Sequence, residues 1–539
     1  MTQAAPIALT SPAPTAARGW LAQAGVIALL AGVGLLILPP LLYLAASAVQ
    51  AGSLGAISIG SLGGLVFTTL SLATLATTWA MMLALPLAWL VVRTDLPFRN
   101  LCRWLAVVPL AIPSYIGAMA YIALLGPVGS VNAWFTTLTG SQQQWINIYG
   151  FWGGVFVLGL FTYPYIFLLA STALEATNPS VEETARSLGE SPLGVLRRVT
   201  LPMLRPSVLA GGLLVFLYAL SDFGSLSLLR VHVFTTAIYH QLNTRFDQAS
   251  SAMLSFVLVL ITLAVLVGQR ILLSRRSYVT ITGTARMARP LRLGRWRWPA
   301  AALTGGILGL SVFIPLGVLL AQTGSGGQFL EVLREQGGFI QNSLVMAGMA
   351  ATLAMILGFL IAFTAKHAQR RTGAVLTGTI QVGYAIPGTV LGLSLILLYN
   401  TYLPWLYGTV GVLVLAYLIR FLTQPVQGVE SALAAINPHL EEAARSLAAS
   451  PGAVLRQILA PLVRPTLFAV WTLVFISAMK ELDATLLLRP AGFDTLSVRV
   501  YIHTVEAEYA KAGTLALLLI AFTVLPWSVV THLQEKKIV

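Results

Sequence analysis

The sequence predicts an all-α integral membrane protein with twelve transmembrane helices, built as two six-helix halves that repeat in the same orientation. Composition, long apolar runs and one duplicated segment support this fold class. Of the 539 residues, 57% are hydrophobic and 9% are charged, whereas soluble domains carry about 25% charged residues. The mean hydropathy is +0.83. Such a composition excludes a soluble globular protein and a disordered one.

The apolar runs have the length and continuity of membrane helices. Crossing a hydrocarbon core about 30 Å thick takes roughly 20 apolar residues, and β-barrel strands would instead alternate over about ten residues. We expect the first run to be a retained helix, since eleven further spans follow it. The expected spans are 20–49, 62–92, 104–126, 148–171, 207–229, 250–273, 299–321, 342–365, 374–399, 408–430, 465–488 and 513–531.

Charge predicts the topology. The chain has 32 Lys and Arg against 18 Asp and Glu, and most basic residues fall in cytoplasmic segments if both termini are cytoplasmic, as the positive-inside rule requires. The predicted segments are a tail (1–19), a first half (20–273), a basic linker (274–298), a second half (299–531) and a tail (532–539). The linker has arginines and no acidic residue, so we expect it to bind lipid headgroups rather than nucleic acid.

A duplicated segment divides the chain. Residues 178–188 recur as residues 437–447, and the offset of 259 holds without a gap to Arg230 and Arg489. Upstream, 111–113 match 385–387 with an offset of 274, so the first half holds 15 more residues in its outer loop around 126–145. Parallel repeats imply a pseudo-twofold axis along the membrane normal, with a pathway where the halves meet.

The repeated segment predicts a cytoplasmic helix–turn–helix. Asn178 suits an N-cap with Pro179 at the first helical position, and Gly189 can end that helix in the left-handed conformation. Ser191-Pro192 then opens a second short helix, which we expect to stop at Leu201-Pro202. A plain connecting loop is the alternative, but its length and its duplication disfavour that interpretation. Reading DNA is disfavoured because both ends are tethered at the bilayer.

At this loop the sequence resembles a known family. Glu183-Thr184-Ala185, Gly189 and 199–202 look like the Glu-Ala-Ala loop of bacterial ABC importer permeases. The resemblance implies a coupling helix that sits in a cleft of a cytoplasmic ATPase subunit. Two loops in one chain imply a fused permease of a type I importer in the bacterial inner membrane. Its partners would be two copies of the ATPase and a periplasmic or lipid-anchored substrate-binding protein.

The coupling residues follow from matching both copies to that pattern. They are Glu182, Glu183, Ala185, Gly189, Pro202, Glu441, Glu442, Ala444, Ala448 and Pro461. The second copy departs from the pattern, since Ala448 replaces the glycine and Ala460 replaces a leucine. A residue other than glycine in a left-handed turn costs roughly 1 kcal/mol, so that turn is expected to be distorted or to dock more weakly.

The chain has no ATPase motif of its own. A phosphate-binding loop needs Gly-Lys followed by Ser or Thr, and none of the lysines follows a glycine. No polar stretch is long enough for an α/β ATPase domain. We therefore expect a transport subunit rather than an enzyme, with no cofactor of its own and with ATP and Mg bound on the partner ATPases.

Charged residues inside apolar spans are the candidates for the pathway. Each costs about 2.5–3.5 kcal/mol at the bilayer centre, and the candidates are Asp222, Lys480, Glu481 and Asp483. Asp222 aligns with Glu481 under the offset of 259, so one acidic position recurs across the axis. They either line the translocation pathway or form ion pairs, such as Lys480 or Arg420 with a carboxylate, that lock helices together.

The assignment of the transported substrate is based on resemblance alone. Segments 221–224, 234–239 and 479–490 look like those of fused ferric-iron permeases, which implies iron(III); thiamine or another small solute is the alternative. The histidines show no metal-ligand spacing and the chain has one cysteine, so no metal site is expected. An ion-coupled secondary transporter is disfavoured because it has no use for the duplicated loop. A membrane-embedded enzyme is disfavoured because no catalytic cluster converges.

Overall fold

The computed structural model describes residues 16–535, except 51–58, 142, 178, 275–289, 368–369 and 448. Within these residues the chain is helical, and the one β-bridge joins Thr94 to Leu291. Among the described residues, ten helices are long and apolar enough to cross a membrane, or up to twelve if each of two bent pairs is one span. The expected all-α membrane fold is therefore confirmed, while the count of twelve depends on the bent pairs.

The first half packs around three long helices, α2, α6 and α9, which contact one another. All three are apolar enough to cross a membrane. The bounds in the first half are α1 (Ala16–Gln50), α2 (Ile59–Arg93), α3 (Arg99–Leu105), η2 (Val108–Ala111), α4 (Ser114–Leu125), α5 (Ser130–Thr139), α6 (Phe151–Ala176), α9 (Leu201–Ser221), α10 (Gly224–Leu228), α11 (Phe234–Asn243) and α12 (Gln248–Ser274).

The second half repeats this arrangement with α16, α20 and α23 in mutual contact. Its elements are η4 (Gly294–Trp296), α13 (Arg297–Leu308), η5 (Gly309–Phe313), α14 (Ile314–Gln322), α15 (Gly326–Glu335), α16 (Gly337–His367), α17 (Arg370–Ala385), α18 (Gly388–Tyr402), α19 (Val410–Phe421), α20 (Thr423–Ala434), α23 (Ala460–Met479), α24 (Asp483–Leu488), α25 (Leu496–Val505) and α26 (Tyr509–Glu535).

Proline breaks one predicted span in each half. The expected continuous helix 104–126 is instead α3, the 3₁₀ turn η2 and α4, and the expected helix 374–399 is α17 and α18 bent by 102°. Pro113 and Pro387 precede α4 and α18 with φ of −57° and −55°. A proline cannot donate a helical hydrogen bond and its ring clashes with an earlier carbonyl. The spans predicted for 207–229 and 465–488 likewise end early, at Ser221 and Met479.

The first helix of each half lies against the other half. Helix α1 contacts α17 and α18, while α14 and the π-helical turn η5 contact α4 and α6. Polar bonds mark both contacts: the Tyr43 hydroxyl lies 3.1 Å from Thr401 Oγ1, and the Tyr121 hydroxyl donates to the Leu310 carbonyl over 2.6 Å. These exchanged helices join the two halves.

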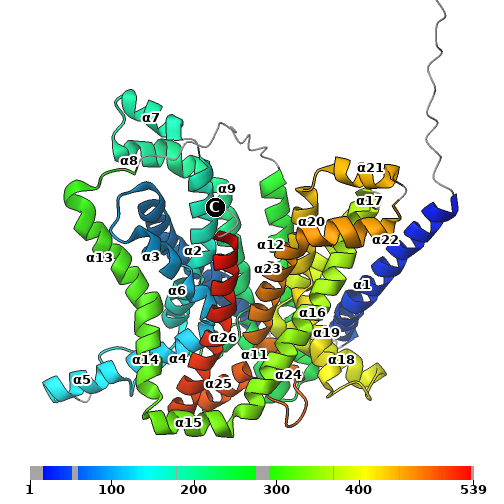
Figure 1. Ribbon diagram of the computed structural model, residues 1–539. Coiled ribbons are helices and arrows are strands. Elements are labelled where there is room, and N and C mark those ends of the chain that lie inside the picture. Colours follow the sequence, from blue (N-terminus) through cyan, green and yellow to red (C-terminus); the bar gives the residue numbers. More distant parts are fainter. Residues whose placement is uncertain are drawn as a thin grey trace, which may run out of the picture.

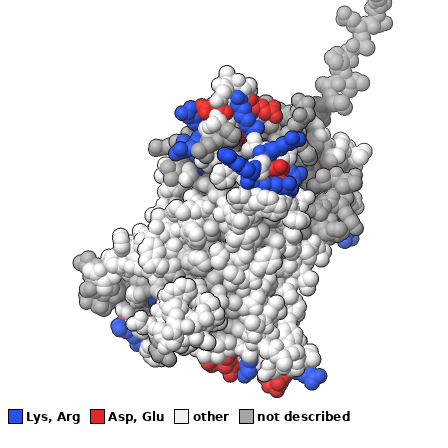
Figure 2. All heavy atoms as spheres, turned by 90° about the vertical axis from the view of Figure 1, so that its left-hand side faces the viewer, with Lys and Arg blue, Asp and Glu red and all other residues white. Residues whose placement is uncertain are grey.

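The two ends of the bundle differ. Four short helices lie at one end, together with the start of α1 and the end of α26: α7 (Pro179–Ser187), α8 (Pro192–Val195), α21 (Pro438–Ser446) and α22 (Pro451–Val454). Helices α5, α15 and α25 lie at the other end (Figure 1). We call these the loop end and the opposite end. Charged side chains gather at both ends, and the band between them is uncharged on the face shown in Figure 2. This band has the character of a surface in contact with lipid.

Part of the predicted linker lies outside the described residues, as do most of the first tail and the last four residues. The described end of the linker packs on the loop after α2. The Leu291 N–H donates to the Arg93 carbonyl over 2.8 Å, and the Leu293 N–H donates to the Asp95 carboxylate over 2.8 Å. The second half therefore begins at a fixed place on the first.

Candidate functional site: two loops and the cavity between the halves

The first loop contains the predicted glycine turn and serine start, while the predicted N-cap, Asn178, lies outside the described residues. Helix α7 (Pro179–Ser187) ends in a Schellman motif, in which Gly189 has φ of +89°. The Glu190 N–H donates to the Ala185 carbonyl over 3.1 Å and the Gly189 N–H to the Arg186 carbonyl over 3.0 Å. Ser191 then caps α8 (Pro192–Val195) by accepting from the Gly194 N–H. Both predictions about this loop, the glycine turn and the serine start, are confirmed.

The second loop has the same build. Helix α21 (Pro438–Ser446) ends with the Ala449 N–H donating to the Ala444 carbonyl over 3.1 Å. Ser450 caps α22 (Pro451–Val454) by accepting from the Ala453 N–H. The predicted distortion at Ala448 lies outside the described residues. The bond between Ala449 and Ala444 matches the one between Glu190 and Ala185, so the two loops end their first helices alike.

The second short helix does not stop at Leu201-Pro202, and that prediction is wrong. Helix α8 continues through a π-helical turn, η3 (Leu196–Thr200), directly into α9. The second half repeats this with η6 (Leu455–Leu459), followed by Pro461 near the start of α23. A π turn widens the helix just before the proline, which relieves the clash with the preceding turn. Each loop is therefore rigidly continuous with a long helix.

One glutamate of each loop is buried and anchors it to its own half. Glu182 is 5% exposed, lies 3.5 Å from the Arg93 guanidinium at the end of α2, and accepts from the Thr200 hydroxyl over 3.1 Å. Glu441 is 7% exposed and pairs with Lys366 near the end of α16 over 2.5 Å. Sequence reasoning missed Arg93 and Lys366, although each is a basic residue at the end of an apolar span.

The next glutamate of each loop points outward. Glu183 and Glu442 are exposed, and His439 lies 2.9 Å from the Glu442 carboxylate at the surface. Two leucines that sequence reasoning also missed stand beside them, Leu188 at 80% exposure and Leu447 at 84%. Each loop therefore presents an acidic residue and an uncovered leucine at the loop end of the protein.

A cavity of about 530 Å³ lies between the halves. Its wall includes residues of η2, α4, α6 and α9 from the first half and of α17, α19, α20 and α23 from the second. All four predicted pathway residues line it: Asp222, Lys480, Glu481 and Asp483. The structure therefore brings together residues that lie more than 250 positions apart in the sequence.

Asp222 holds the wall of the cavity through hydrogen bonds. Its carboxylate accepts from the hydroxyls of Ser114 and Ser225, each over 2.5 Å, and from the Ser225 N–H over 3.1 Å. Ser114 opens α4 and Ser225 lies in α10, so one carboxylate joins three elements. Ser114 also lies 3.0 Å from the Tyr218 hydroxyl. No cation pairs with Asp222 among the described residues.

Glu481, by contrast, forms an ion pair. The Arg420 guanidinium lies 2.7 Å from its carboxylate, which also accepts from the Ala484 N–H over 3.1 Å. The backbone confirms the alignment of this position with Asp222, because the Asp222 carbonyl accepts from the Thr235 hydroxyl and the Glu481 carbonyl from that of Ser497. The ion-pair hypothesis thus holds for Glu481, while its carboxylate still lines the cavity.

Lys480 reaches across the boundary between the halves. Its ammonium donates to the Leu110 carbonyl, at the end of η2, over 2.7 Å. Beside it, a Cβ on Gly224 would lie 2.7 Å from the Leu482 side chain, so the loop after α9 and the loop after α23 touch. Lys480 is therefore bound to the backbone of the other half, and no carboxylate of the described residues pairs with it.

Two copies of one membrane bundle, joined around a shared cavity and each bearing the same loop, define a duplicated transport subunit. The chain belongs to the family described as the binding-protein-dependent transport system inner membrane component, whose model matches residues 76–278 and 354–538. It is therefore an inner-membrane permease of an ABC transporter and not an enzyme. Membership of this transporter family implies a binding protein and an ATPase as partners.

Similar proteins include ferric permeases. The chain is 28% identical over 428 residues to the Fe(3+)-transport system permease protein FbpB 2 of Haemophilus influenzae, covering 78% of this chain and 79% of that one. It is 26% identical to the ferric transport system permease protein FbpB of Actinobacillus pleuropneumoniae, covering 76% and 62%. A Haloferax volcanii protein described as a probable molybdenum ABC transporter permease is 33% identical, covering 28% and 54%.

Proposed function

We propose that this permease moves iron(III) from a periplasmic or lipid-anchored binding protein across the bacterial inner membrane. Two copies of a partner ATPase would supply the energy by hydrolysing Mg-bound ATP. The observation that supports this most is the pair of loops of like build. A buried glutamate anchors each loop to a long helix of its own half, and each loop continues into a helix that lines the shared cavity. Each ATPase would dock on one loop.

The continuity of the loops explains how force reaches the cavity. Each loop runs without a break into α9 or α23. Those helices end at Ser221 and Met479, just before the cavity residues Asp222 and Glu481. When ATP draws the two ATPases together, the loops would approach each other and the opposite end would open. A docked binding protein would then release its cargo into the cavity.

This scheme places the loop end in the cytoplasm, with both termini there. The start of α1 and the end of α26 both lie beside the loops, which supports that orientation (Figure 1). The charged residues around the loops, which Figure 2 shows as mostly basic, agree with the positive-inside rule.

Iron(III) is proposed because three of the relatives that cover about three quarters of the chain are named as ferric permeases. Thiamine or another small solute is the alternative, and the molybdenum relative matches a shorter stretch. Uptake of radioactive iron(III), thiamine and molybdate by cells with and without this chain tests the cargo. Iron uptake that depends on the chain supports the proposal, and dependence of another solute alone overturns it.

Co-purification tests the docking of the ATPase. Leu188→Asp with Leu447→Asp places charge on the exposed leucines, so we expect the ATPase to be lost from the purified complex. Val128→Asp is the matched control, because Val128 is 93% exposed at a turn away from the loops. Retention of the ATPase by the double variant would show that docking lies elsewhere, while the cargo assignment would stand.

A further inference from the structure

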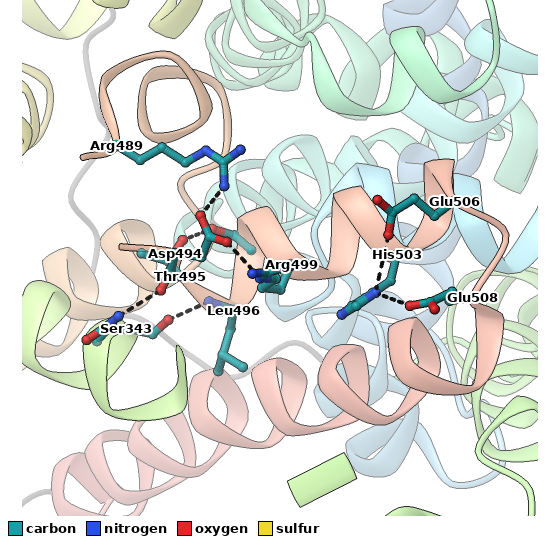
Figure 3. Close-up of polar contacts among 11 residues, drawn as sticks. Ser343, Arg489, Asp494, Thr495, Leu496, Arg499, His503, Glu506 and Glu508 are labelled. Carbon is teal, nitrogen blue, oxygen red and sulfur yellow. Dashed lines mark hydrogen bonds and ion pairs between the residues drawn. The ribbon is translucent and has the colours of Figure 1, made fainter. Parts of the chain in front are cut away.

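A histidine and two glutamates converge at the opposite end of the protein, where no site is expected from the sequence. His503 lies in the last turn of α25, Glu506 follows that helix, and Glu508 precedes α26. The His503 ring points toward both carboxylates (Figure 3). Their ligand atoms all lie within 4.8 Å of one another.

We propose that His503, Glu506 and Glu508 bind one first-row transition-metal cation. Imidazole nitrogen with carboxylate oxygen is a donor set that suits such cations. In metal sites these atoms lie about 2.0–2.2 Å from the ion, so ligand atoms are separated by a few ångström. His503 Nδ1 lies 2.6 Å from Glu508 Oε2 and 3.8 Å from Glu506 Oε2. Small side-chain rotations would bring all three onto one ion.

The burial of His503 is the second observation that points to a ligand. The residue is 4% exposed, and among the described residues neither ring nitrogen has a partner that meets hydrogen-bond geometry, although Nδ1 is close to Glu508. Leaving a buried polar group without a hydrogen bond costs free energy. The carboxylates are open to solvent, at 57% and 42% side-chain exposure. A cation could therefore enter from water and keep water in its remaining positions.

A tight turn sets this geometry. Ala507 has φ of +61°, and the Glu508 N–H donates to the His503 carbonyl over 2.8 Å. The bond folds Glu508 back beside the imidazole. Lys511 takes the other carboxylate oxygen of Glu508, Oε1, over 3.3 Å, which leaves Oε2 facing His503.

The repeat shows that the fold does not need these side chains. In the first half the Gln241 carbonyl accepts from the Asp247 N–H over 2.9 Å, Thr244 follows α11 and Asp247 precedes α12. Gln241, Thr244 and Asp247 thus stand where His503, Glu506 and Glu508 stand in the second half. The Asp247 carboxylate accepts from the Ser250 hydroxyl and N–H and so caps α12. The three ligands are present in one copy only, so the turn itself does not explain them.

The site goes beyond the proposed transport function and depends on no particular cargo. The alternative is a plain ion pair of protonated His503 with Glu508, which would bind no metal. The surface pair of His439 and Glu442 offers a comparison, since it has one histidine and one carboxylate within 2.9 Å but belongs to no three-ligand group among the described residues.

Cobalt(II) is a suitable probe because its visible absorption reports coordination by nitrogen and oxygen. The full-length protein is purified in detergent without its affinity tag, stripped with a chelator and titrated with Co²⁺. We expect one equivalent to bind with visible absorption bands, and His503→Gln to abolish those bands. Glu506→Gln should weaken binding at least about tenfold, the lower range for losing even an outer-shell partner. His439→Gln should bind as the wild type does.

Folding is controlled by the choice of variants. His503→Gln installs the residue that the first half uses at this place, and Glu506 is exposed, so both are expected to elute as monodisperse protein. Cobalt should also raise the unfolding temperature of the wild type and not that of His503→Gln. Absence of the absorption bands in the wild type, or equal binding by His503→Gln, would overturn the site.

Discussion

The Lys480 ammonium of the second half donates to the Leu110 carbonyl of the first half over 2.7 Å, at the wall of the shared cavity. Leu110 belongs to η2, the 3₁₀ turn that separates α3 from α4. The break in the predicted third span is what frees this carbonyl, since a continuous helix would have used it internally. Lys480, which the sequence indicates as a pathway residue or an ion-pair partner, is thus a link between the halves.

Replacing Lys480 with methionine should loosen that link. Methionine keeps the apolar stem but leaves the Leu110 carbonyl without its donor, which costs about 1–3 kcal/mol for a buried group. We expect a lower unfolding temperature in detergent and reduced uptake. Arg103→Gln is the control, because its pair with Glu175 is exposed at 51% and 42% and should contribute little. An unchanged unfolding temperature for Lys480→Met would contradict the structural role.

Variants of Glu441, the buried glutamate of the second loop, and of Glu442, its exposed neighbour, should distinguish ATPase docking from the coupling of hydrolysis to uptake. Glu441→Gln removes the charge that pairs with Lys366, so we expect the ATPase to stay bound while its hydrolysis no longer drives uptake. Glu442→Gln changes the exposed neighbour and should weaken ATPase binding instead. The two variants differ by one position and by opposite burial, at 9% and 69% side-chain exposure. Loss of ATPase binding with Glu441→Gln alone would reverse these roles.

The turns and caps within the loops could be predicted from the sequence, whereas the ion pairs that hold the loops to the long helices could not. Gly189 and Ser191 act on their own neighbours, so a one-dimensional pattern is enough to place them. Glu182 of α7 contacts Arg93 because the tertiary fold places the last residue of α2 beside the loop. The sequence shows which residues are charged but does not show which helix ends meet.

The difference between local patterns and contacts of distant elements also explains which features of the membrane region and of the opposite end could be predicted. The repeat predicted that Asp222 and Glu481 are equivalent, yet their partners differ, because Arg420 is present beside one and hydroxyls surround the other. The metal-ligand cluster was missed because the spacing of His503 and Glu508 acquires its meaning only from the left-handed Ala507. A turn of that kind at alanine has no local sequence signal.

Gly189→Ala should have a modest effect. A Cβ at this position would meet no atom within 4 Å, so the cost is that of the left-handed conformation, roughly 1 kcal/mol. The second loop already has Ala448 in the matching place. We expect ATP hydrolysis to become partly uncoupled from uptake, measured as ATP consumed per cargo molecule, and Gly189→Val to be worse. Equal coupling in all three proteins would remove the role of this turn.

Cys102 provides a test of orientation. It is the single cysteine, it lies in α3 near the loop end, and burial raises the pKa of its thiol. A membrane-impermeant maleimide should label it in inside-out vesicles and not in intact spheroplasts. The thiolate is the reactive form, so labelling should be slow at neutral pH and accelerate as the pH rises. In a Cys102→Ala background, Val128→Cys should be labelled from the outside only; the reverse pattern would invert the topology.

The two hypotheses for the cavity carboxylates can be separated at Arg420 and Glu481. Removing one partner of a buried ion pair costs about 3–5 kcal/mol because it leaves an uncompensated charge. Arg420→Gln and Glu481→Gln should therefore each reduce the yield of folded complex, and the double variant should recover it. We expect uptake to stay low in the double variant, because the carboxylate that lines the cavity is gone.

Asp222→Asn completes that comparison. Its carboxylate is held by hydroxyls and backbone N–H groups rather than by a cation, so the stability loss should be smaller, about 1–3 kcal/mol. Uptake should fall as far as in the double variant, with the ATPase still bound. If uptake instead returns whenever stability returns, the carboxylates serve only to hold helices together, and the translocation pathway does not depend on their charge.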